Sequence, residues 1–215
     1  MKIKLRNLIT ISVALLGVLV PATALAAPSS NLSQTITAGT LSTDILDGTR
    51  TPVASPSVAM SATNFSFSCQ TVTGTLGSST QRLYVTDPSS TLNGWTLALA
   101  ATGGATAKLQ NGGATSSYAY NDATGSGCTN GQLTVNPSVG TVTADCTSTN
   151  CTGATITKGA STAMTSSTPV TLMTGTASAN VWRGYLTGAT LSQQIPAEQP
   201  ADSYTIGMTL TVTAN

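Results

Sequence analysis

The apolar and polar positions along the chain alternate in the manner of short β-strands separated by turn residues. The clearest alternation is in residues 204–214, where apolar side chains take turns with threonines and a glycine. A period of two puts one face of a strand against a core and the other face in solvent. Segment 95–101 repeats the pattern, with Trp95, Leu97 and Leu99 on one face. We therefore predict that these two segments are neighbouring strands of one sheet.

Similar short runs recur along the chain and are bounded by Gly, Pro, Asn and Ser. The predicted strands are 39–45, 57–62, 65–71, 82–86, 95–101, 108–110, 132–135, 141–145, 154–157, 170–173, 181–185, 190–195 and 203–213. Many short strands with turn residues between them indicate an all-β fold, an antiparallel β-sandwich. No sustained helical periodicity follows the first residues. Segments 102–120 and 159–167 are rich in small polar residues, so we predict that both are surface loops.

The N-terminus has the pattern of a secretory signal peptide. Basic residues at positions 2, 4 and 6 precede an apolar stretch at 8–20, and Ala24-Leu25-Ala26 forms a small-x-small cleavage site. The apolar stretch is too short for a membrane-spanning helix. The predicted organisation is a signal peptide at 1–26, a flexible leader at 27–38 and one β domain at 39–215, with no transmembrane segment after cleavage.

Charge and composition narrow the class of partner. After the predicted cleavage, five basic and seven acidic residues remain, which gives a net charge of −2. No basic stripe is left to follow a phosphate backbone, so we expect no nucleic-acid partner. Docking on anionic lipid is disfavoured for the same reason. A chain rich in Thr, Ser and Gly and poor in charge is typical of secreted surface proteins.

The four cysteines predict two disulfide bonds. Cys69, Cys128, Cys146 and Cys151 all follow the predicted signal peptide, and an even number in an exported chain favours disulfides. One arrangement closes the short loop from Cys146 to Cys151 and joins Cys69 to Cys128. Another joins Cys128 to Cys146 across a hairpin at 132–144. A zinc site is disfavoured because the chain has no histidine and no Cys-x-x-Cys pair.

No residue pattern in the chain indicates catalysis. Without histidine, the Ser-His-Asp and Cys-His arrangements are excluded. Asp44 and Asp47 are three residues apart, which places them on opposite faces of a strand, and we assign them to the turn at Asp47-Gly48. Asp87 precedes a proline turn, and Glu198 lies in a proline-bounded loop. The protein is predicted not to be an enzyme, with Asp87 and Glu198 as the residues of a secreted-hydrolase alternative, and no cofactor or metal is predicted.

The two tryptophans are candidates for either core packing or sugar binding. Trp95 alternates with leucines, which favours a core position, although an exposed indole could also stack on a carbohydrate. Trp182 is close to Arg183 and Tyr185, a combination that suits a binding surface or the edge of a core.

Several motifs resemble the WxL surface proteins of Gram-positive bacteria. They are 39–41 (Gly-Thr-Leu), 64–67 (Asn-Phe-Ser-Phe), 85–87 (Val-Thr-Asp), 94–97 (Gly-Trp-Thr-Leu) and 201–205 (Ala-Asp-Ser-Tyr-Thr). They bracket nearly the whole predicted mature chain, whereas the middle, 102–190, does not share the resemblance. The family carries a second Trp-x-Leu in its closing strand, and this chain has Leu210-Thr211-Val212 there.

The resemblance implies a secreted, non-catalytic protein that associates non-covalently with the cell wall. Its ligand would be peptidoglycan, another wall component or a wall-anchored partner protein. The wall-binding candidates are Trp95, Leu97, Leu210, Val212, Trp182 and Tyr185. The alternative is a structural subunit of a surface assembly, in which strands and the leader pair with neighbouring copies.

Overall fold

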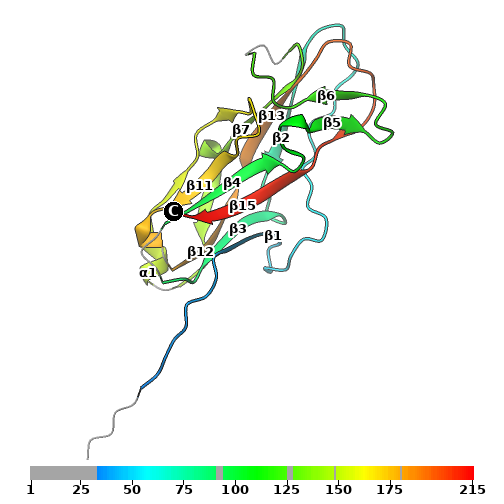
Figure 1. Cartoon of the computed structure of the whole chain (residues 1–215). Helices are drawn as coiled ribbons and strands as arrows, with labels where there is room; N and C mark the ends of the chain where they lie inside the picture. Colours follow the sequence, from blue (N-terminus) through cyan, green and yellow to red (C-terminus); the bar gives the residue numbers. More distant parts are fainter. Residues whose placement is uncertain (1–32, 91–93, 125–127, 148, 180) are drawn as a thin grey trace, which may run out of the picture. The chain divides into compact units, whose positions relative to one another are not determined.

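The computed structural model describes residues 33–90, 94–124, 128–147, 149–179 and 181–215 (Figure 1). By internal contacts the chain divides into two units, Met1–Ile36 and Thr37–Asn215, and every described strand belongs to the second. The predicted signal peptide at 1–26 lies outside the described residues, as does the first half of the predicted leader, residues 27–32.

The second unit is all-β, and all of its strand pairs are antiparallel, which confirms the predicted fold class. The strands are β1 (Ser42–Leu46), β2 (Gln70–Leu76), β3 (Arg82–Asp87), β4 (Trp95–Ala101), β5 (Lys108–Asn111), β6 (Ser117–Ala119), β7 (Gln132–Asn136), β8 (Thr141–Ala144), β9 (Ile156–Lys158), β10 (Thr162–Ala163), β11 (Val170–Gly175), β12 (Trp182–Thr187), β13 (Ala189–Ile195), β14 (Tyr204–Thr205) and β15 (Met208–Ala214). In the described residues one turn of α-helix occurs, α1 (Thr149–Thr152). No helix in the described ranges is both long and apolar enough to cross a membrane.

The strands form four sheets around one hydrophobic core. Sheet A has the order β1-β3-β12-β8, sheet B β10-β7-β13-β2, sheet C β15-β4-β11-β9 and sheet D β14-β5-β6. As predicted, the closing strand β15 pairs with β4, beside which it lies in Figure 1. The register of this pair sets Leu210 opposite Leu99. Leucine, valine and aromatic side chains from all four sheets contribute to the core.

A pair of tryptophans joins sheets A and C. Trp95 on β4 is 0% exposed, and its ring centroid lies 5.2 Å from that of Trp182 on β12. The indole Nε1–H of Trp95 donates a hydrogen bond of 3.3 Å to the carbonyl oxygen of Ala179. Because each tryptophan belongs to a different sheet, their contact shows that these two sheets pack face to face. The core position predicted for Trp95 is confirmed.

Each indole ring packs directly against the backbone of a glycine, at a position where a side chain would overlap the ring. A Cβ atom added at Gly175, which pairs with Trp95 across β4 and β11, would lie 2.5 Å from Cε2 of that ring. A Cβ atom at Gly184 would lie 2.4 Å from Cζ2 of Trp182. Distances this short do not occur between non-bonded carbon atoms, so both glycines are required by the packing of the two rings.

Two disulfides stabilise the fold, as predicted. The bonds join Cys69 to Cys128 and Cys146 to Cys151, the first of the two arrangements considered from the sequence. The long-range bond spans 59 residues of sequence and the short one spans 5.

The structure corrects three strand predictions. Segment 57–62 forms no named strand and contributes one isolated bridge, between Met60 and Gly74. The strand predicted at 65–71 begins at Gln70, and the rings of Phe65 and Phe67 are exposed and touch edge to face. The strand predicted at 203–213 is two strands, because β14 pairs with β5 in sheet D and β15 pairs with β4 in sheet C.

The two predicted surface loops contribute to the core. Segment 102–120 contains β6 in addition to the predicted strand at β5, and its Tyr118 and Tyr120 are buried. Segment 159–167 contains β10, and Met164 is 2% exposed. A few large side chains among many Gly, Ser and Thr residues are enough to anchor both segments to the core. The prediction failed because it was based on the average composition of each segment and not on these few residues.

We predict that Gly175→Ala destabilises the protein, because the new methyl group would overlap the Trp95 ring. Overpacking of this kind costs about 1–3 kcal/mol. The measurement is urea unfolding followed by tryptophan fluorescence. The matched control is Gly112→Ala, where a Cβ atom would meet nothing within 4 Å. An equal loss of stability in the two variants would show that the Trp95 ring does not require glycine at position 175.

Candidate functional site

The outer face of sheet A carries a cluster of charged and aromatic side chains. We call it the arginine–tyrosine cluster, and it consists of Arg50, Arg82, Tyr84, Asp145, Arg183 and Tyr185. It contains all three arginines of the described part of the chain. In a chain whose charged residues make up 7% of the total, this concentration on one face is the most distinctive polar feature described.

The centre of the cluster comes from two Arg-x-Tyr segments on neighbouring strands. Tyr84 on β3 and Tyr185 on β12 lie directly opposite each other in the antiparallel register, with ring centroids 5.0 Å apart. The guanidinium of Arg82 lies 4.6 Å from the centroid of the Tyr185 ring. Both contacts follow from strand geometry, in which opposite and diagonal side chains of one face meet.

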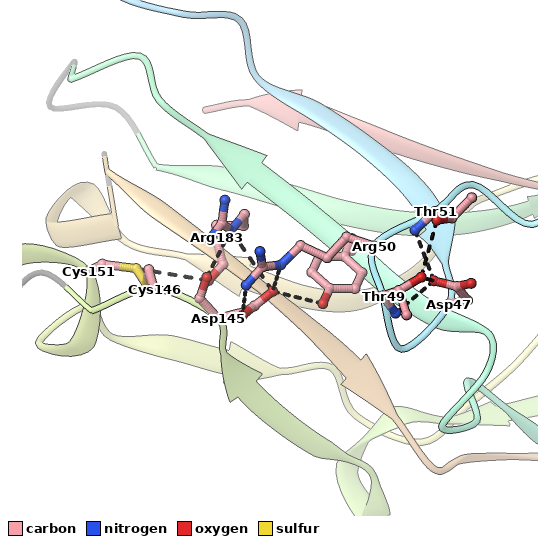
Figure 2. Close-up of polar contacts among 9 residues, drawn as sticks. Asp47, Thr49, Arg50, Thr51, Asp145, Cys146, Cys151 and Arg183 are labelled. Carbon is pink, nitrogen blue, oxygen red and sulfur yellow. Dashed lines mark hydrogen bonds and ion pairs between the residues drawn. A yellow bond between two sulfur atoms is a disulfide. The ribbon is translucent and has the colours of Figure 1, made fainter.

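A tight turn after β1 positions Arg50. The Asp47 carboxylate accepts hydrogen bonds from the backbone N–H groups of Thr49 and Thr51 and from the Thr49 hydroxyl, as Figure 2 shows. The Thr51 backbone bond is the largest of the effects that lower the pKa of Asp47. Within this turn Arg50 has a φ of 68°, a left-handed conformation that is uncommon for residues other than glycine. The turn predicted at Asp47-Gly48 is therefore present.

Asp145, which follows β8, is the acceptor at the middle of the cluster (Figure 2). Arg50 donates to its two carboxylate oxygens in a bidentate pair, at 2.6 Å from Nε and 2.7 Å from Nη2. The hydroxyl of Tyr84 donates a third bond of 2.9 Å. These contacts, with the Arg50 hydrogen bond as the largest, lower the pKa of Asp145 to about 2. The pKa of Tyr84 is raised by burial and by its bond to this carboxylate.

Arg183 extends from β12 beside Asp145. Its Nε donates a 2.8 Å bond to the backbone oxygen of Asp145, and the Asp145 N–H donates to the backbone oxygen of Arg183 at 2.8 Å. The disulfide between Cys146 and Cys151 follows immediately and closes the loop after this residue. The Arg183 side chain is 42% exposed, and no described residue makes a hydrogen bond to its two terminal nitrogens. These nitrogens are donors that a ligand can reach.

The residues proposed from the sequence are distributed between the core and this face. Trp95 and Leu97 are 0% exposed and Trp182 is 2% exposed, so none of the three presents a ring or side chain to a ligand. Leu210 and Val212 are half-buried on β15 and pack against the core. Tyr185 is the one candidate that belongs to the arginine–tyrosine cluster.

The carboxylates considered for a hydrolase do not form a pair. Asp87 is 3% exposed at the end of β3, where it accepts a hydrogen bond from the Ser89 N–H. Glu198 lies in the loop after β13, and its own backbone N–H donates to the carbonyl oxygen of Ser66. In the described ranges no three His, Cys, Asp or Glu side chains gather in a way that could hold a metal ion.

The sequence contained a pattern that would have located the cluster. Arg-x-Tyr occurs twice, at 82–84 and 183–185, in a chain with few basic and few aromatic residues. In a β-strand, residues at this spacing share a face. The pairing of Arg50 with Asp145 had no such pattern, because 95 residues separate them.

Chemically, the cluster combines guanidinium donors, a carboxylate and aromatic rings on one sheet face. This set suits recognition of a ligand that offers hydroxyl and carboxylate oxygens together with apolar ring faces. Comparison of the chain with protein-family models, curated proteins and solved structures found no match.

We predict that Asp145→Asn lowers stability at neutral pH and that the difference from wild type vanishes in acid. The pKa of Asp145 is about 2 in the folded protein, below the ordinary value of 3.8 for an aspartate side chain. A carboxylate with a lowered pKa contributes its stability above pH 3.8, and loses it as the pH falls through about 2. The measurement is the urea midpoint of both proteins at several pH values between 7 and 2.

Asp202→Asn tests the same dependence on pH at a carboxylate outside the cluster. Asp202 also has a lowered pKa, which comes mainly from a hydrogen bond to Asn111 in sheet D. It makes no contact with the cluster. A midpoint difference between Asp145→Asn and wild type that stays constant down to pH 2 would contradict the predicted role of Asp145.

Proposed function

We propose that this protein is a secreted, non-catalytic surface protein that associates non-covalently with the cell wall, and that the arginine–tyrosine cluster is its contact surface. The observation that carries the proposal is the gathering of all three described arginines and the half-buried ring of Tyr185 on the outer face of sheet A, supported from below by Tyr84, which is 1% exposed. Peptidoglycan is the ligand class that fits this surface best.

The chemistry of peptidoglycan matches the groups in the cluster. Its sugar rings present apolar C–H faces that can pack on the half-buried ring of Tyr185, and its peptide stems and lactyl groups provide carboxylates and amides. An arginine guanidinium binds a carboxylate through two parallel hydrogen bonds. Arg183 and Tyr185 are two residues apart on β12, so they share the outward face of one strand.

The resemblance to the WxL proteins supports the same class of function but assigns a different task to the motif. With Trp95 and Leu97 in the core, the Trp-x-Leu segment acts by holding sheet C against sheet A. Aliphatic Leu210 and Val212 can fill the equivalent positions of the closing strand. Wall binding in this chain then depends on the opposite face of sheet A.

An extracellular location is compatible with the structure. Two disulfides are stable in oxidising compartments and rare in the cytosol. The predicted signal peptide at 1–26 provides the route of export, and association with the wall is the proposed destination.

We predict that Arg183→Ala and Tyr185→Ala each reduce binding of the mature protein to purified peptidoglycan by at least about tenfold, as expected for loss of a charged or aromatic contact of about 1.4 kcal/mol. The measurement is co-sedimentation with insoluble peptidoglycan over a range of protein concentrations. Unfolding curves of each variant establish that it is folded.

Lys108→Ala is the matched control, because it removes one positive charge from sheet D while leaving the cluster intact. It should bind as wild type does. Retention of full binding by both cluster variants would reject this surface as the contact. Failure of the wild-type protein to sediment would reject peptidoglycan as the ligand.

A further inference from the structure

Strand β15 leaves a seven-residue sheet edge without a backbone partner. It is the terminal strand of sheet C and pairs on one side with β4 over its whole length. No backbone hydrogen bond joins its other side to any described segment. Strand β1 of sheet A lies beside β15, but its ladder is formed with β3. The backbone groups along the free side of β15 therefore have no hydrogen-bond partner among the described residues.

The other long terminal strand of the sheets is covered. β2 also has seven residues, but Ser61 bonds to Thr73 through both its backbone and its hydroxyl, and Met60 bridges to Gly74. The remaining terminal strands have between two and five residues. Within the described ranges, β15 is the longest terminal strand whose second side has no backbone hydrogen-bond partner.

β15 lacks the features by which natural proteins block edge pairing. Residues 208–214 contain no charged residue, no proline and no glycine, and no register shift interrupts the pairing with β4. Free edges are usually protected by lysine, proline, a bulge or a covering segment. Thr209, Thr211 and Thr213 are exposed and alternate with half-buried Leu210 and Val212. The edge thus has high strand propensity and no electrostatic barrier to a partner strand.

We propose that β15 is a dimerisation edge, at which two copies of the chain pair their β15 strands antiparallel about a two-fold axis. The register that uses all seven residues places Thr211 on the axis, opposite itself. It also sets Thr209 opposite Thr213 and Leu210 opposite Val212. Thr–Thr and aliphatic pairs are favourable across antiparallel strands. The two four-stranded C sheets become one sheet of eight strands.

A second copy fits this edge better than the leader of a neighbouring chain does. A two-fold interface has to be complementary to itself, and an uncharged strand with alternating Thr and aliphatic residues meets that condition. The described leader residues 33–38 offer one large apolar side chain, Ile36, and Gly39 follows them. Pairing with a second β15 strand and pairing with a leader also give different assemblies. Edge-to-edge pairing closes at a dimer, whereas leader pairing continues from copy to copy.

The register gives a site-specific test by disulfide cross-linking of the mature protein. Cα atoms directly opposite across antiparallel strands are about 4.5–5.5 Å apart, within the range that a disulfide spans. Thr211→Cys should therefore form a covalent dimer under mild oxidation, seen on a non-reducing gel. Thr209→Cys is the matched control on the same exposed face, since its two copies would lie about 13 Å apart at 3.3 Å per residue. Mass spectrometry identifies the linked peptide and shows that the native disulfides are intact.

Sedimentation over a range of concentrations tests the free edge without cysteine chemistry. The wild type should form dimers and no larger species. Thr211→Lys should remain monomeric, because it places two like charges opposite each other on the axis. Thr73→Lys, on the covered edge of β2, should dimerise as wild type does. Thermal unfolding of both variants confirms that they are folded.

Three outcomes would overturn the proposal. The first is a wild-type protein that stays monomeric at every concentration. The second is cross-linking at Thr209→Cys equal to that at Thr211→Cys. The third is an open-ended assembly that is lost on deletion of residues 33–38 and retained in Thr211→Lys, which would identify the leader as the pairing strand. None of these outcomes depends on binding of peptidoglycan at sheet A.

Discussion

The contact between Trp95 and Trp182 is the constraint on which the rest of the structure depends. It fixes β4 of sheet C against β12 of sheet A, and it requires glycine at positions 175 and 184 where the rings lie. Because successive side chains of a strand point to opposite faces, burying Trp182 places its neighbour Arg183 on the outer face. The core and the arginine–tyrosine cluster are thus two faces of the same strand, and a change in the register of β12 would exchange them.

The elements that the sequence predicted best are those with strict alternation. Segment 95–101 is a strand over the predicted residues, and its partner at the end of the chain lies beside it. Predictions failed where local pattern and tertiary pairing disagree. Residues 203–213 alternate without interruption, yet the chain passes from sheet D to sheet C between β14 and β15. Segment 159–167 looked like a polar loop, but burial of one side chain, Met164, fixes it to the core.

The candidate site could be predicted in part. Tyr185 was identified because tyrosine and arginine occur together near Trp182, and the repeat of Arg-x-Tyr at 82–84 completes the aromatic centre. Arg50 and Asp145 lie in segments that follow β1 and β8, the opposite edges of sheet A, and their contact spans the outer face of that sheet, so it depends on the strand order. Strand order depends on the packing of the whole chain, and no spacing within a local segment encodes it. Trp95 and Leu97, the motif on which the family resemblance rests, are buried in the core. The arginine–tyrosine cluster, which is the proposed contact surface, lies on the outer face of sheet A and contains neither residue.

The ion pair between Arg50 and Asp145 has a mechanical consequence. It connects the turn after β1 with the end of β8, and so it ties the two outer strands of sheet A together across β3 and β12. Tension applied to the segment before β1 would load this tie in addition to the β1–β3 ladder. Separating β1 from the sheet then requires rupture of a bidentate charged contact as well as backbone bonds. Such a tie raises the force needed to peel β1 away from sheet A.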